Sequence, residues 1–345
     1  LRSVLRKEGI SIHVIPENPI LVYRNFNLNK DNYLYFSEEG RIHADISLFD
    51  DNRTGLRVYS TPDSTVTQDI TLAINNLNIG EFKRIIPYMP DIDGNINAEA
   101  HYVADINNTP MASIEAGINS LAYYKQPLGD WNLSAAYLPK EDGTHHIDGF
   151  LTRDDETIAE ISGSYLSAEN VNVSDKIDAN LKLMHFPLRI ANAFVPKEVA
   201  GIYGYIDSDI SLNGSSSRPE INGNIKMDSV NIYVPMASMN LRFEDKPISI
   251  KDNKLVFNKY SIFSKGKNPY VIDGNVDFSD MENMYMDLRM TARNFELFNG
   301  KKNKESLIYG KMYIDLNTTI KGTTNNISVK GNANILGNSD FTYVL

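Results

Sequence analysis

The sequence predicts an all-β fold, a mainly antiparallel sheet built from about three repeats of roughly 110 residues each. Apolar and polar residues alternate over many short runs, including residues 206–212 and 284–292. This period of two is typical of strands with one apolar face. Turn residues separate the runs at hairpin length. The pattern recurs along the chain, since the Gly-Asn step at Gly331 follows the one at Gly223 by 108 residues.

The repeats divide the chain into four segments. The first is a partial β repeat, the next two are β repeats that each begin with a short helix, and the last is the start of a further repeat that is cut short. Their limits are residues 1–80, 81–187, 188–300 and 301–345. In residues 1–80 the clearest strand is 40–48, where apolar and polar residues alternate.

Two short amphipathic helices are expected near residues 81–89 and 188–195. In the first, Phe82, Ile85, Ile86 and Met89 fall on one face at helical spacing. A proline near the end of each run limits its length. Two interpretations remain open for both helices: a gate on a lipid path, or a plug at the end of a sheet.

Gly-Asn steps punctuate the alternating runs. They lie at positions 94, 223, 274 and 331. Glycine inside a strand weakens it and often marks a bulge or a bend. We therefore expect these steps to shape curved strands and to have no role in chemistry.

Composition narrows the functional class. The 345 residues are 23% charged and 42% hydrophobic, which is ordinary for a folded chain. The formal net charge of −10 argues against a nucleic-acid partner, because phosphates require clustered cations. There is no cysteine, and no apolar run has the length of a membrane span. Because the chain starts at Leu1 and its last residues read as a strand, we expect it to be a segment of a longer protein.

Several motifs together carry a resemblance to a known family. They are the run from Gly204 through Gly214 to the Gly223-Asn224-Ile225 step, the alternating run 270–278 and the closing run 337–345. In order and spacing these motifs resemble the C-terminal domain of the TamB family, the AsmA-like inner-membrane subunits of the translocation and assembly module, in a Bacteroidetes-type form. The likeness is strongest from about residue 180 onward.

The resemblance implies a curved, trough-like sheet whose apolar concave face holds phospholipid acyl chains on their way to the outer membrane. It also implies a periplasmic segment of a protein anchored in the inner membrane, with a TamA-like outer-membrane barrel of the Omp85 family as partner and a role in outer-membrane protein assembly. Methionine suits a mobile guest, because its thioether side chain is flexible. The groove residues that we expect are Ile225, Met227, Ile232, Val234, Met284, Met286 and Leu288.

Motifs for catalysis and for metal binding are scarce. The six histidines include no HExxH motif. The run that starts at Asp91 lacks the EF-hand pattern, because its twelfth position is Tyr102 instead of glutamate. We therefore expect no catalytic residue, metal or cofactor, and no enzyme. Two alternatives remain open: an extracellular β-repeat adhesin, and a β-solenoid polysaccharide lyase or hydrolase that uses carboxylates such as Asp148, Asp154 and Asp155.

Overall fold

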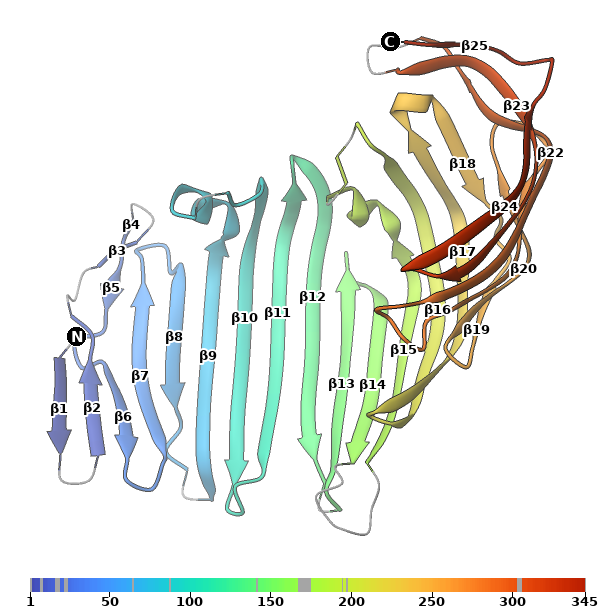
Figure 1. The fold of residues 1–345 in the computed structure, drawn as a ribbon. Coiled ribbons are helices and arrows are strands. Elements are labelled where there is room, and N and C mark those ends of the chain that lie inside the picture. The colour runs from blue at the N-terminus through green and yellow to red at the C-terminus, as the bar shows by residue number, and fades with distance from the viewer. Residues whose placement is uncertain are drawn as a thin grey trace. The chain divides into compact units, whose positions relative to one another are not determined.

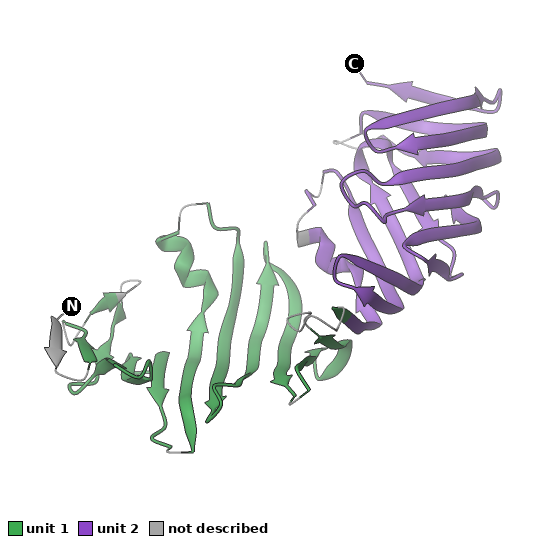
Figure 2. Ribbon diagram, turned by 60° about the horizontal axis from the view of Figure 1, so that its bottom comes forward, with its two compact units in different colours: residues 1–176 green, residues 177–345 purple. Residues whose placement is uncertain are grey.

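A computed structural model describes residues 2–6, 9–15, 19–21, 24–63, 65–86, 88–140, 142–166, 175–193, 195–196, 198–302 and 306–344. The chain divides into two compact units, unit 1 with residues 1–176 and unit 2 with residues 177–345 (Figure 2). Each unit is nearly all β (Figure 1). The prediction of an all-β, curved and antiparallel sheet is confirmed.

Unit 1 is an antiparallel meander in which most strands pair with their neighbours in the chain. Pairing runs from β1 through β2, β6, β7, β8 and onward in order to β14, with β5 beside β7. A separate small hairpin joins β3 and β4. The strands are β1 (Arg2–Arg6), β2 (Gly9–His13), β3 (Ile20–Leu21), β4 (Arg24–Asn25), β5 (Asn27–Leu28), β6 (Tyr33–Ser37), β7 (Ile42–Phe49), β8 (Gly55–Ser60), β9 (Val66–Asn78), β10 (Ile92–Asp105), β11 (Pro110–Tyr123), β12 (Gln126–Pro139), β13 (Thr144–Arg153) and β14 (Glu156–Leu166).

Unit 2 continues the same design with longer strands. β16 pairs with β15 and β17, and β17 then pairs with both β18 and β19, which both pair with β20. Pairing continues in order to β23, which pairs with both β24 and β25. The strands are β15 (Lys176–Pro187), β16 (Gly201–Ser215), β17 (Arg218–Val234), β18 (Met239–Phe243), β19 (Ile248–Lys251), β20 (Lys254–Phe263), β21 (Tyr270–Asp277), β22 (Tyr285–Gly300), β23 (Ile308–Thr323), β24 (Asn326–Ile335) and β25 (Asp340–Tyr343).

Unit 2 is strongly curved. Its later strands bend back toward its earlier ones, as the two ribbon views show (Figures 1 and 2). The bend brings the turn after β17 against the chain around β22 and β23: the Leu307 N–H donates to the Met236 carbonyl oxygen at 3.0 Å. A Cβ on Gly300 would lie 2.0 Å from the Ser238 Cβ, so this contact requires glycine.

The short helices are 3-10 turns. They are η1 (Ile79–Arg84), η2 (Leu188–Ala193) and η3 (Pro235–Ala237). Both expected helices are thus present but shorter than 81–89 and 188–195, and residues 87 and 194 of those ranges lie outside the described residues. Ile85 and Ile86 follow η1 and are exposed, so the helical-face expectation was wrong for them.

Six of the described strands contain the same local feature, a non-glycine residue with a positive φ. The backbone N–H of this residue donates to a side-chain oxygen of the next strand or loop. The pairs are Asn76 with Asn97, Ser120 with Asp130, His185 with Asp207, Ser229 with Asp245, Lys259 with Asp273, and Asn294 with Asp315. Each lies where the pairing register shifts, which marks a β-bulge.

The bulges keep apolar residues on one face. A bulge adds one residue, so the spacing between successive apolar positions becomes three instead of two. Phe257 is followed by Tyr260, and Ala292 by Phe295, across the bulges at Lys259 and Asn294. The strand bends at that point without turning its apolar residues to the other side.

The Gly-Asn steps do not all mark bulges. Gly94 lies at a register shift, whereas Gly223 pairs in register with Ile210. Gly223 has φ +150°, and a Cβ there would lie 2.2 Å from the Asp209 carbonyl oxygen. Close approach of the neighbouring backbone explains this glycine.

Candidate functional site

The groove residues predicted in β17 and β22 belong to one face of the unit 2 sheet. A single row of paired positions crosses nine strands of this sheet. It runs through Leu181, Ile210, Gly223, Ile250, Leu255, Val276, Met286, Gly322 and Ile327. Ile225 lies two positions after Gly223, and Leu288 two positions after Met286. Side chains two apart in a strand point to the same side, so these residues share the face of the row.

The other predicted residues extend the same face. Met227 follows Ile225 at the same spacing, and the bulge at Ser229 lets Ile232 and Val234 continue its side. Ile232 pairs with Ile202 and Leu241, two apolar neighbours. Met284 precedes β22 and lies outside the strand. All seven predicted residues are half-buried. The register places six of them, all but Met284, on one face.

The residues between them face the other way and are polar. Asn224 and Lys226 alternate with Ile225 and Met227 and are exposed. In β22 the Asp287 carboxylate pairs with the Lys321 amine at 2.8 Å. The two faces of the sheet therefore differ in chemistry, as expected for a sheet with one apolar side.

The deepest part of the apolar face in unit 2 surrounds aromatic residues. Phe295 is only 2% exposed, and its ring lies 5.9 Å from that of Tyr270. Burial raises the pKa of Tyr270. Burial also raises the pKa of Tyr260, with help from the nearby Glu244 carboxylate. Both phenols therefore stay neutral across physiological pH, and this end of the face remains uncharged.

Unit 1 has an apolar face that sequence reasoning missed. Three parallel rows of paired positions lie on strands β8–β14; the first and third span all seven strands, and the second spans β9–β14. The rows contain Val58, Leu72, Ala100, Ile114, Ala135, Gly149 and Ile161; then Ile70, Tyr102, Ala112, Tyr137, Ile147 and Gly163; then Leu56, Ile74, Ala98, Ala116, Leu133, Leu151 and Ala159. Every side chain in these rows is uncharged.

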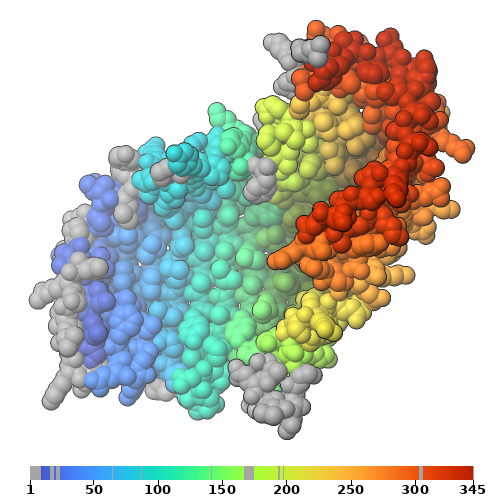
Figure 3. Space-filling model, viewed as in Figure 1, coloured from blue at the N-terminus to red at the C-terminus, as the bar shows by residue number. Residues whose placement is uncertain are grey.

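This face is open. Leu72 is 41% exposed, Ile147 50% and Ile161 47%, which is high for large apolar side chains. A shallow hollow of about 550 Å³ lies over the middle strands and is lined by Leu72, Ile114 and Tyr137 among others. The space-filling view shows these strands side by side with one face of the sheet uncovered (Figure 3).

The opposite face of the same strands is polar. A row of paired positions there runs through Arg57, Ala73, Glu99, Glu115, Ser134, Phe150 and Glu160. The Ser134 hydroxyl donates to the Glu115 carboxylate at 2.9 Å, and the His101 ring lies 3.0 Å from the Asp69 carboxylate. Charged and polar side chains favour contact with water, so the exposed apolar rows on the other face are the unusual feature of unit 1.

The apolar rows consist almost entirely of hydrocarbon side chains. They contain hydrocarbon side chains, glycine and two tyrosines, with no nucleophile, carboxylate or imidazole. The Tyr137 hydroxyl lies 2.6 Å from the His145 Nδ1 atom. Contact between such side chains and other apolar groups is favourable, because it removes both from water.

One group of metal-type ligands occurs among the described residues. Single ligand atoms of His185, Asp207 and Asp228 lie within 4.8 Å of one another. Asp207 also accepts the His185 backbone N–H at 2.8 Å, which is its part in a bulge. His185 stacks on Tyr205, with the ring centroids 3.6 Å apart. The bulge accounts for the placement of Asp207.

Comparison with protein-family models, with curated proteins and with solved structures finds no match to this chain. In the part of the chain that the structure describes, no helix has the length and apolar character that crossing a membrane requires.

Proposed function

We propose that the chain is a periplasmic segment of a TamB-like protein and provides an apolar β surface along which phospholipid acyl chains move toward the outer membrane. The observation that carries this proposal is the open apolar face of unit 1, where three uncharged rows cross six or seven strands each. Its role is binding, without catalysis.

The size of this face suits an acyl chain. Neighbouring strands lie about 4.8 Å apart, so seven strands span roughly 29 Å. One leaflet contributes about half of the ~30 Å hydrocarbon core of a bilayer, so an acyl chain extends over roughly 15 Å. An acyl chain can therefore lie across several strands and advance along the rows without leaving apolar contact.

Energetics explain why an extended surface is needed. Exposing a chain of about 16 methylenes to water costs on the order of 13 kcal/mol, at ~0.8 kcal/mol for each CH₂. A carrier has to replace that contact at every point of the route. Repeated rows of similar residues provide equivalent positions, so that no single pocket traps the lipid.

The sequence-predicted residues of unit 2 support the same proposal. Met227 and Met286 lie on the apolar face, where flexible thioethers adapt to a guest that changes position. Met286 faces the glycine Gly322 on the next strand, which leaves space beside it. We include Ile225, Ile232, Val234 and Leu288 in this surface because the register places them on the same side.

A role in outer-membrane protein assembly, with a TamA-like barrel as partner, rests on a different feature. All ten residues of β24 are exposed, and among the described residues this strand pairs with β23 alone. Exposed Ile327, Val329 and Ile335 alternate along it. A free edge with alternating apolar residues can accept another strand by backbone pairing, which is how strands of a client or a barrel would bind.

Lipid extraction tests the transport proposal. The chain is purified without detergent and examined by native mass spectrometry and by organic extraction, beside a Met286→Glu variant. We expect phospholipid on the parent and less on the folded variant, because the carboxylate lies on the apolar face of unit 2 while that of unit 1 is unchanged. Tyr285→Glu is the matched control, since Tyr285 points to the opposite face and should leave the bound lipid unchanged. Absence of phospholipid from the folded parent would remove the basis of the proposal.

A further inference from the structure

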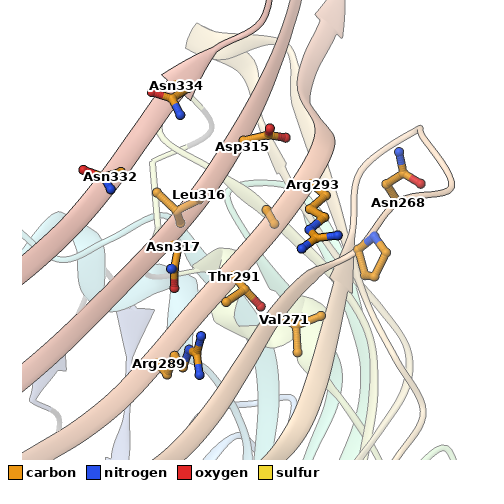
Figure 4. Close-up of a pocket in the computed structure, with 12 residues that line it drawn as sticks. Asn268, Val271, Arg289, Thr291, Arg293, Asp315, Leu316, Asn317, Asn332 and Asn334 are labelled. Carbon is orange, nitrogen blue, oxygen red and sulfur yellow. The ribbon is translucent and has the colours of Figure 1, made fainter.

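A polar hollow lies on the outer face of unit 2, on the side opposite the apolar rows. Its volume is about 580 Å³, and strands β21–β24 together with the loop before β21 form its walls. The side chains come from alternate positions of paired strands: Val271, Thr291, Asn317 and Asn332 form one row across them. Figure 4 shows Arg289 and Arg293 along one strand and Asn332 with Asn334 along another.

The two arginines lack partners. Among the described residues, neither Arg289 nor Arg293 makes an ion pair or a hydrogen bond through its guanidinium group. One cation nearby on the same face behaves differently: the Lys321 amine pairs with Asp287 at 2.8 Å, one row away. Two guanidinium groups therefore offer free donors at one place, in the planar arrangement that fits a carboxylate.

The rest of the hollow is rich in amides. No described residue binds the side-chain amides of Asn317, Asn332 or Asn334, and each offers an acceptor and two donors. Asp315 uses one carboxylate oxygen to accept the Asn294 N–H at 2.7 Å, which leaves the other oxygen to accept from a ligand. Ligand hydroxyl groups suit such a mixed set, because a hydroxyl both donates and accepts hydrogen bonds.

We propose that this hollow binds an acidic oligosaccharide. The free guanidinium groups would pair with sugar carboxylates, while the amides and Asp315 would bind hydroxyls. With two arginines against one carboxylate, the lining carries a net positive charge within a chain whose net charge is −10. The lining has no aromatic ring, so the site favours a hydroxyl-rich ligand over a flat apolar one. This site is separate from the lipid surface, and its chemistry does not depend on the proposed transport function.

Titration calorimetry tests the proposal with short oligomers of galacturonate, alginate and hyaluronan, each with a carboxylate in its repeat, and with neutral galacto-oligosaccharide. We expect at least one acidic oligomer to bind, and we expect the double variant Arg289→Gln, Arg293→Gln to weaken that binding by about tenfold or more. A second double variant, Asn317→Ala and Asn332→Ala, should weaken it as well. Arg84→Gln removes one positive charge from unit 1 and should change nothing.

Each other outcome overturns the proposal. If no acidic oligomer binds the folded parent, the hollow is no saccharide site. If binding survives both double variants, the oligomer binds elsewhere. If acetate or inorganic phosphate displaces the oligomer at equal concentration, the arginines form a non-specific anion-binding site that does not recognise the sugar. Circular dichroism of every variant establishes that the sheet is intact.

Discussion

Replacing Ile114 with aspartate should weaken lipid binding by unit 1 about a hundredfold. Ile114 lies in the middle row of the open apolar face, between Ala100 and Ala135, and lines the hollow there. Alanine on both sides makes it the largest apolar side chain at that point. A carboxylate at this position would meet any acyl chain that crosses the centre of the sheet.

The magnitude follows from the exposure of the side chain. Ile114 is 36% exposed, so a ligand can cover about a third of it, worth roughly 0.5–1 kcal/mol out of the ~1.5–3 kcal/mol for full burial. Covering a polar group without a partner costs a further 1–3 kcal/mol or so, and more for an ion. A total near 3 kcal/mol corresponds to a loss of affinity of about a hundredfold.

The assay measures the affinity of the folded chain for a fluorescent fatty acid or phospholipid in detergent-free buffer. Ser113→Asp is the matched control, because Ser113 is the neighbouring residue and faces the polar side, paired with His101 and Ala136. The control should bind as the parent does. Equal affinity of parent and Ile114→Asp, with both folded, would refute the assignment of this face to lipid.

Three further predictions concern the fold. Asp273→Ala should lower the free energy of unfolding of unit 2 by about 1–3 kcal/mol in a denaturant titration, because the Lys259 N–H loses its acceptor. Asp273→Asn keeps an acceptor oxygen and should have little effect. Equal losses in the two variants would contradict this role. Phe295→Ala should cost about 3–5 kcal/mol in the same titration, and a loss below 1 kcal/mol would show that the site is not packed. Hydrogen bonds from Thr109 and Asn107 lower the pKa of Asp105 below its ordinary value of 3.8. The ionised carboxylate therefore stabilises the fold above pH 3.8, and this stabilisation is lost as the pH falls through the lower folded-state pKa. Asp105→Asn should reduce the fall in melting temperature with acid, and an unchanged acid profile would contradict the assignment.

Local patterns predicted the strands well, because alternation is a property of neighbouring residues. The run 206–212 lies within β16, and the run 284–292 lies within β22 except for its first residue, Met284. Turn chemistry between the runs was equally local. The antiparallel meander follows from short connections between successive strands. These features need no knowledge of distant contacts.

The open face of unit 1 was harder to predict, because much of it consists of small residues. Ala98, Ala112 and Ala116 alternate with polar residues, yet alanine is a weak sign of a buried face. Their importance comes from the register, which aligns Ala116 with Leu133 and Ala112 with Tyr137 on the next strand. Register is set by long-range pairing, and no single run contains it.

The bulges were also missed, although they leave a trace in the sequence. A spacing of three between apolar residues interrupts the spacing of two, as from Met227 to Val230, and an acidic or amide residue follows in the next strand or loop. Such a spacing alone equally fits a loop or the start of a helix. The partner residue identifies the bulge only once the pairing of the two strands is known.

The bulges connect curvature with function. A long strand that bends by slipping one position would turn its remaining apolar residues to the polar side, because neighbouring side chains point in opposite directions. The added residue at Asn294 prevents this, so Phe295 stays on the face of Ala292 while Asp315 binds the N–H that the bulge exposes. The same solution at six strands allows each sheet to curve and still keep one continuous apolar face. Curvature and an uninterrupted face are the two properties that a surface for a moving acyl chain requires.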